Sequence, residues 1–134
     1  MTRIRLVRAP NLAAVEYAYA STVSAGARMV YVAGACPLDS DGSVVGRDDL
    51  AAQTVQCLDN LVAALEAAGA VLTDVVETRV LVASSDRADL ATVWDVYRER
   101  FGDHDVPSTL IGVAVLGYVN QLVEIEATAA VMSD

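Results

Sequence analysis

The sequence predicts a single α/β domain of the α+β kind, over residues 1–134, with six strands and two helices in the order βββαβαββ. Two segments repeat apolar residues at helical spacing, and most of the other segments alternate apolar and polar residues as strands do. The length suits one domain with its own hydrophobic core. We therefore expect a mixed sheet that carries both helices on one face.

The first helix is predicted over Arg47–Ala68, where apolar side chains recur at spacings of three and four residues. Asp48 and Asp49 stand at its start, where carboxylates favour a helix, and Gly69 provides the stop. The second helix is predicted over Arg87–Phe101, between an aspartate that can cap it and a glycine that can end it. Both helices have an apolar side that needs covering.

Six further segments are predicted to be strands. In the last of them Glu124 and Glu126 alternate with apolar residues, and in the fourth Glu77 and Arg79 do the same. The sheet face away from the helices would therefore mix apolar and charged groups, which suits a subunit interface. The strands are Ile4–Arg8, Tyr17–Ser24, Met29–Ala33, Val75–Ala83, Thr109–Leu116 and Leu122–Val131.

The charge composition excludes several function classes. All nine basic residues are arginine, eighteen residues are aspartate or glutamate, and the formal net charge is −9. Such a surface repels phosphate backbones, so we expect no nucleic-acid partner. The absence of lysine also excludes Schiff-base chemistry.

The apolar composition predicts a subunit interface. The apolar fraction is 54%, but no stretch reaches the ~20 apolar residues that cross a bilayer, so we expect no membrane partner. The surplus apolar surface must therefore enter the core or an interface between subunits. The first residues lack the pattern of a secretory signal, which predicts a cytoplasmic protein.

Cys36 and Cys57 are too few and too far apart for a metal site, so we predict no metal, no cofactor and two unreactive thiols.

Several short motifs occur in an order and spacing that resemble those of a known family. They are Ala25–Gly34 followed by Pro37–Asp39, then Leu58–Leu61, Glu66–Ala70, Asp74–Thr78, Val93–Tyr97, Gly112–Ala114 and Leu122–Ala127. Together they resemble the Rid/YjgF family, also described as RidA-like or endoribonuclease L-PSP proteins, over nearly the whole chain from Tyr19 onward.

This resemblance implies a chorismate-mutase-like fold and a homotrimer with a small-molecule cleft between neighbouring subunits. The family's deaminases hydrolyse reactive enamines and imines to a keto acid and ammonia. That chemistry needs a group that binds the substrate carboxylate, a positioned water, and hydrogen bonds around the imine.

The resemblance assigns roles to several residues of this chain. Glu124 matches the cleft glutamate that helps to orient the water. Tyr19 matches the cleft tyrosine if one residue is inserted before the third strand, and Tyr17 is a competing candidate. Ala33 stands where many relatives have a serine, and the backbone donor of Gly34 remains.

One departure concerns the arginine with which the family binds carboxylates. An alignment without gaps across the last two strands places Ser108 at that arginine, and we assign Leu110 to the same cleft. A neutral hydroxyl replaces a charged fork, so we predict poor hydrolysis of ordinary 2-imino acids and a gain from Ser108→Arg. Arg79 either replaces the missing group or neutralises Glu77 or a facing carboxylate.

The function predicted from the sequence is an atypical Rid-type protein. We predict that it binds a small metabolite and hydrolyses it as an imine or enamine hydrolase does. Glu124 would place the water. A second hypothesis is a protein that only binds or senses such a molecule. A ribonuclease is the weakest hypothesis because of the charge of −9.

Overall fold

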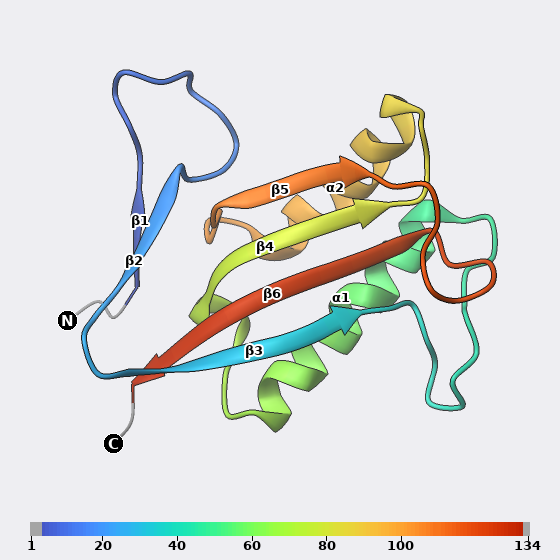
Figure 1. Cartoon of the computed structure of the whole chain (residues 1–134), viewed down its shortest axis with the longest axis horizontal. Coiled ribbons are helices and arrows are strands. Elements are labelled where there is room, and N and C mark those ends of the chain that lie inside the picture. Colours follow the sequence, from blue (N-terminus) through green and yellow to red (C-terminus); the bar gives the residue numbers. More distant parts are fainter. Residues whose placement is uncertain (1–3, 133–134) are drawn as a thin grey trace.

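The order of elements agrees with the prediction. A computed structural model describes residues 4–132, with two helices, one short 3₁₀ helix and six strands (Figure 1). The elements are β1 (Ile4–Val7), β2 (Ala20–Val23), β3 (Ala27–Ala35), α1 (Leu50–Ala67), the 3₁₀ helix η1 (Leu72–Asp74), β4 (Val75–Val82), α2 (Arg87–Phe101), β5 (Ser108–Gly112) and β6 (Val123–Met132).

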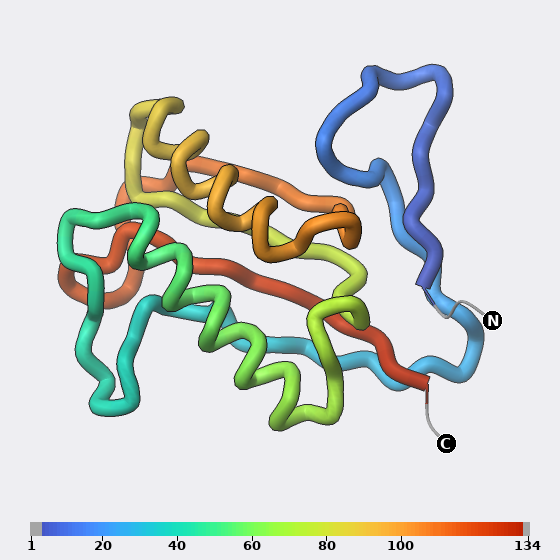
Figure 2. Tube along the Cα trace, turned by 180° about the vertical axis from the view of Figure 1, so that it is seen from behind, coloured from blue at the N-terminus to red at the C-terminus, as the bar shows by residue number. Residues whose placement is uncertain are grey.

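Four strands form one mixed sheet in the order β3-β6-β4-β5. Strands β4 and β5 are parallel and joined through α2, whereas β6 runs antiparallel to both of its neighbours. Both helices lie on the same face of this sheet, as the view from behind shows (Figure 2). The other face carries no helix, and we call it the open face.

The helix α1 begins three residues later than the sequence pattern suggests. Asp48 has a φ of 60°, which is incompatible with a helix, and the Asp49 side chain caps the first turn by accepting from the Ala52 N–H at 3.0 Å. The apolar side of α1 packs against the sheet and against α2. The fully buried side chains of this core include Leu58, Leu61, Leu65, Val80, Val82, Val93 and Ile125.

Strand β5 is shorter than predicted. The strand ends at Gly112 rather than at Leu116 because its partner β4 ends at Val82, whose carbonyl accepts the last hydrogen bond from Val113 at 2.8 Å. Gly112 also passes close to the chain that follows β4, since a Cβ there would lie 2.5 Å from the Ser84 carbonyl oxygen. The chain then leaves the sheet.

The first two strands form a separate hairpin, β1–β2, instead of extending the sheet. It lies beyond the edge where β4 and β5 begin (Figure 1), and Ser21 there donates to the Val76 carbonyl at 2.7 Å. Glu16 pairs with Arg98 at 2.7 Å, so the hairpin's loop is tied to α2. Strand β2 begins at Ala20 rather than at the predicted Tyr17, and Ala18 instead donates to the Asp105 carbonyl at 2.8 Å.

Neither helix within residues 4–132 is long and apolar enough to cross a membrane. The same residues contain no group of three or more His, Cys, Asp or Glu side chains placed to hold a metal ion.

Candidate functional site

The strand register sorts the predicted site residues onto two faces of the sheet. Glu124 of β6 pairs with Leu81, and Glu126 pairs with Arg79, so Glu124 and Arg79 both point to the open face. In β5, Ser108 pairs with the buried Thr78. Residues of β5 at even positions therefore point toward the helices.

Ser108 takes part in a hydrogen-bonded cluster under α2. Its hydroxyl lies 2.9 Å from the hydroxyls of Thr78 and Tyr97, which are 2.6 Å from each other, and it donates to the Val106 carbonyl. Burial raises the pKa of Tyr97, so this phenol stays protonated. These contacts give Ser108 a structural role under the helix.

The structure does not bring Ser108 or Leu110 to Glu124 within one chain. Leu110 is partly buried against the main core, on the same covered face as Ser108. Thr109 is the β5 residue beside Arg79 on the open face, and it is exposed. The alignment with the family assigned Ser108 to the cleft, and the five residues of β5 lack the alternation that would have shown which of them face outward.

Glu124 is held at the opposite end of the open face from the hairpin. Its Oε1 atom accepts a hydrogen bond from Nε2 of Gln121 at 3.1 Å and another from Sγ of Cys36 at 3.3 Å. Its Oε2 atom lies against Gly34, where a Cβ would be only 2.2 Å away. The carboxylate therefore occupies space that any other residue at position 34 would fill.

Strand β3 is irregular where it meets this carboxylate. The register between β3 and β6 shifts between Val32 and Ala35, a bulge that contains Ala33 and Gly34. Ala33 is exposed and Gly34 is half-buried. The bulge and the missing side chain together make room for Glu124.

Cys36 remains a thiol at neutral pH. Burial, the hydrogen bond to Glu124 and the charge of Glu124 raise the pKa of Cys36 to about 11. The amide of Asn60 fixes the Cys36 backbone by donating to its carbonyl at 2.8 Å. Burial also raises the pKa of Cys57, whose side chain is fully buried.

The middle of the open face carries an ion pair and a shallow hollow. Arg79 Nη1 lies 3.3 Å from Oε1 of Glu126, and both side chains are half-exposed. Thr128 donates to Glu77 at 3.3 Å beside them. The hollow, of about 230 Å³, is bordered by Tyr31, which is 79% exposed. Arg79 thus pairs with a facing carboxylate, which is one of the two roles considered for it.

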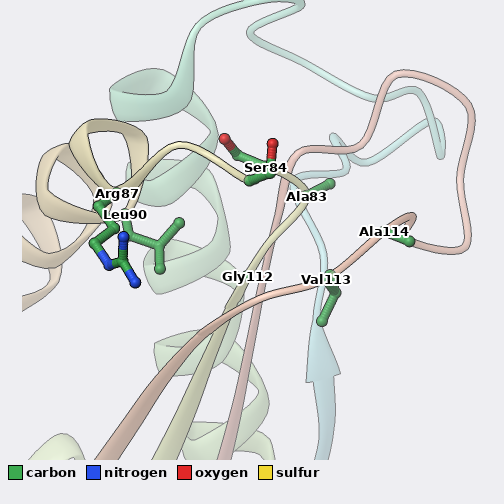
Figure 3. A pocket seen from close by; sticks show the side chains of 8 residues that line it. Ala83, Ser84, Arg87, Leu90, Gly112, Val113 and Ala114 are labelled. Carbon is green, nitrogen blue, oxygen red and sulfur yellow. The ribbon is translucent and has the colours of Figure 1, made fainter.

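A larger hollow, of about 570 Å³, opens where the parallel strands β4 and β5 end and α2 begins (Figure 3). It adjoins the Glu124 end of the sheet, because Ala83 donates to the Leu122 carbonyl at 2.8 Å. Its only charged lining residue is Arg87, which has no carboxylate partner within residues 4–132. The hollow is lined by Ala83, Ser84, Ser85, Arg87, Leu90, Gly112, Val113 and Ala114.

The sequence analysis did not single out Arg87, which lines this hollow, or Gln121, which donates to Glu124. Arg87 was read only as the first residue of a helix, although a strand–helix–strand unit with parallel strands places the helix start beside the strand ends, where ligands bind. No pattern in the sequence marks Gln121, because its contact with Glu124 depends on how the preceding loop folds back.

Tyr19 lies in the hairpin's loop region, away from Glu124. Its hydroxyl donates to the Ala13 carbonyl at 2.7 Å, and its ring meets that of Tyr17 edge-on at 6.0 Å. Tyr17 in turn contacts Trp94 of α2 at 6.3 Å. Neither tyrosine is brought to Glu124 of the same chain.

Comparison with known proteins identifies the family. The sequence model of the endoribonuclease L-PSP family matches residues 9–131. RutC family protein PH0854 of Pyrococcus horikoshii is 36% identical over 111 residues, which are 83% of this chain and 85% of that protein. The chain belongs to this family, known as Rid/YjgF.

Solved structures of Rid/YjgF proteins share the fold. The Rid family protein YyfB of Yersinia pestis matches with a TM-score of 0.87 and 30% identity, covering 97% of this chain and 100% of that one. The YjgF gene product of E. coli matches with a TM-score of 0.65 and 34% identity, covering 92% and 91%. The α+β fold is that of the family.

One similar protein has a name that states a reaction. The 2-iminobutanoate/2-iminopropanoate deaminase of Salmonella typhimurium is 35% identical over 101 residues, which are 75% of this chain and 76% of that protein.

Proposed function

We propose that this Rid/YjgF protein hydrolyses a small imine or enamine and that Glu124 is its general base. The observation that carries the proposal is the fixed carboxylate of Glu124, which lies against Gly34 with one oxygen tied to two neutral donors. A carboxylate held in one orientation can position a water and accept its proton. The similar deaminase of Salmonella typhimurium supports the reaction class.

The reaction divides into two steps. Glu124 accepts a proton from water as the water oxygen bonds to the imine carbon, and the C=N electron pair moves to nitrogen, which then takes the proton from Glu124. The carbinolamine then collapses: Glu124 accepts the hydroxyl proton and passes it to nitrogen, the C–N bond breaks, ammonia leaves, and the oxygen becomes a carbonyl. No redox partner is needed.

We propose a homotrimer in which one subunit completes the site of another. Tyr19 directly precedes β2 of the hairpin, whereas Glu124 lies near the start of β6, which is the end of that strand away from the hairpin (Figure 1), so we expect Tyr19 to meet a Glu124 across a subunit boundary. The half-polar open face and the exposed Tyr31 support such an interface. Light scattering should give three times the chain mass of 14.1 kDa, and a one-chain mass at micromolar concentration would contradict this.

In this proposal the substrate lies beside Ala33, Gly34 and Glu124. The charge of Arg79 is already offset by Glu126, so Arg79 is a weaker carboxylate ligand than a free arginine. Arg87 has no such partner and lines the hollow at the same end of the sheet as Glu124. We therefore add Arg87 to Arg79 as a candidate ligand for a substrate carboxylate.

The second candidate function is binding or sensing without turnover. It is favoured by Thr109 and Ser108, which put no arginine in the segment where the family's carboxylate-binding residue is expected. Ribonuclease activity remains the weakest candidate because of the net charge of −9.

The test is hydrolysis of 2-iminopropionate, generated in situ, by the wild type and by Glu124→Gln, with Glu126→Gln as the matched control. We expect loss of turnover only in Glu124→Gln, because Glu126 already pairs with Arg79. Thermal shift with stable keto and amino acids separates the two functions, since a bound ligand raises the melting temperature without turnover. Binding with no turnover by the wild type would favour the sensing role.

A further inference from the structure

Two neutral donors converge on one oxygen of Glu124. Gln121 Nε2 lies 3.1 Å and Cys36 Sγ 3.3 Å from Oε1, whereas within residues 4–132 no donor reaches Oε2. The two oxygens of this carboxylate are therefore in different environments. A carboxylate tied at one oxygen keeps the other free for a substrate or water.

The Gln121 side chain is fixed by its surroundings. It is 4% exposed, and its amide uses both ends: Nε2 also donates to the Val123 carbonyl at 3.0 Å, and Oε1 accepts from the Tyr118 N–H at 3.1 Å. These bonds fix which end of the amide faces Glu124. The donor toward Glu124 is thus set before any ligand arrives.

Cys36 complements Gln121 from the other side, at the end of β3. With its pKa at about 11, the thiol carries its proton at neutral pH and is a donor to Oε1. An arginine in the place of Cys36 would neutralise the charge of Glu124. Arg79 does this to Glu126, which lies two residues after Glu124 in the same strand. A thiol and an amide orient the carboxylate while leaving its negative charge available.

We propose that Gln121 and Cys36 are positioning residues that hold Glu124 by Oε1, so that Oε2 is the atom that takes the proton of the attacking water. This inference rests on the proposed function for its chemical meaning. Its geometric content does not, because the contacts among Gln121, Cys36 and Glu124 can be tested in the absence of any substrate.

The substrate-free test is the alkylation rate of Cys36 by iodoacetamide between pH 7.5 and 9.5, which follows the thiolate fraction. Cys57 is fully buried, so Cys36 dominates the signal, and mass spectrometry assigns the modified residue. Glu124→Gln should accelerate alkylation several-fold, because it removes the carboxylate that disfavours the thiolate. Gln121→Met should slow it, because the amide of Gln121 favours the thiolate.

Glu126→Gln is the matched control, since it removes a carboxylate from the same strand and face without touching Cys36. Its alkylation rate should equal that of the wild type. If Glu124→Gln leaves the rate of Cys36 alkylation unchanged, the proposed contact is absent and the inference is overturned. Circular dichroism confirms folding, and if Gln121→Met does not fold, Glu124→Gln still decides the contact.

The activity readout tests positioning against a merely structural role. Cys36→Ala and Gln121→Met should each lower kcat several-fold with KM within twofold of the wild type, and Cys36→Ser should recover most of the loss because a hydroxyl also donates. Equal activity of Cys36→Ala and wild type would overturn the role of Cys36. If the wild type hydrolyses no imine, the proposed function fails, while the alkylation rates still decide whether the two residues hold Glu124.

Discussion

The two faces of the four-stranded sheet use polar side chains in different ways. On the covered face, Thr78 and Ser108 bond to each other and to Tyr97, and α2 seals the group. On the open face, Glu124 is tied at one oxygen to neutral donors, and Glu126 pairs with a half-exposed arginine. The covered polar groups form hydrogen bonds with one another, whereas one oxygen of Glu124 has no donor within residues 4–132.

This contrast shows how a site is specified in a small sheet. A polar residue under a helix must find partners within the protein, so it becomes part of the packing. A polar residue on the open face can be left partly unsatisfied until a ligand or subunit arrives. A new charge on the covered face should therefore lower the unfolding free energy much more than a new charge on the open face. The following predictions are ordered from the largest expected effect.

The largest effect is expected where a charge is placed on the covered face. Ser108→Arg would replace the hydroxyl that contacts Thr78, Tyr97 and the Val106 carbonyl with a long charged side chain on the covered face. Overpacking together with burial of part of a charge should cost about 2–4 kcal/mol of unfolding free energy. Urea unfolding followed by circular dichroism measures it.

Thr109→Arg is the matched control, one residue along the same strand on the open face. It should change the unfolding free energy by less than about 1 kcal/mol, as is usual for exposed positions. It also places a guanidinium beside Arg79, where it can serve a substrate carboxylate, so it is the better variant for raising deaminase activity. Equal destabilisation by both substitutions would contradict the assignment of the two faces.

The sequence predicted the helices and strands and which residues of β4 and β6 share the open face. It did not predict which residues of β5 face the helices. In β6 and β4 the alternation is regular, and the register confirms that Glu124, Glu126 and Arg79 share a face. In β5 the run Ser-Thr-Leu-Ile-Gly has no alternation, so the sequence alone did not show that Ser108 pairs with Thr78 and that Thr109 lies beside Arg79 on the open face.

The surroundings of Glu124 lay beyond sequence reasoning for a different reason. Cys36 and Glu124 are 88 residues apart, and their contact depends on a bulge in β3 and on the loop that returns to Gln121. Periodicity within one segment cannot predict a contact between residues so far apart in the sequence. The placement of the β1–β2 hairpin is likewise decided by tertiary contacts, such as the pairing of Glu16 with Arg98.

The second prediction tests how tightly Glu124 is enclosed. Gly34→Ala would place a Cβ 2.2 Å from Oε2 of Glu124, so the carboxylate must swing away and lose its bonds to Gln121 and Cys36. We expect about 1–2 kcal/mol of destabilisation, from strain and lost hydrogen bonds, and loss of any turnover. Thermal melting and the deaminase assay measure the two effects.

A double-mutant cycle separates this clash from a backbone effect. In the background Glu124→Ala, the substitution Gly34→Ala should cost less than in the wild type, because the clashing carboxylate is gone. Additive costs would show that the glycine is needed for the bulge itself rather than for Glu124.

The third prediction concerns alkaline pH. The folded protein raises the pKa of Cys36 from 9.0 to about 11, so between these values the folded state keeps a proton that the unfolded chain has lost. By linkage, the unfolding free energy should fall as the pH rises from about 9 to 11. Denaturant midpoints across this range measure the slope. Cys36→Ala should make the slope shallower, with Cys57 and Tyr97 supplying the rest because their pKa values are also raised.

The smallest effect is expected for the ion pair on the open face. Arg79 and Glu126 lie 3.3 Å apart with both side chains half-exposed, so solvent screens their attraction. A double-mutant cycle with Arg79→Gln and Glu126→Gln should give a coupling of about 0.2–1 kcal/mol that decreases with added salt. If the coupling instead exceeds about 2 kcal/mol and depends on protein concentration, the pair is buried in solution, as it would be at an interface between subunits. The same measurement therefore tests whether the open face stays open in the assembled protein.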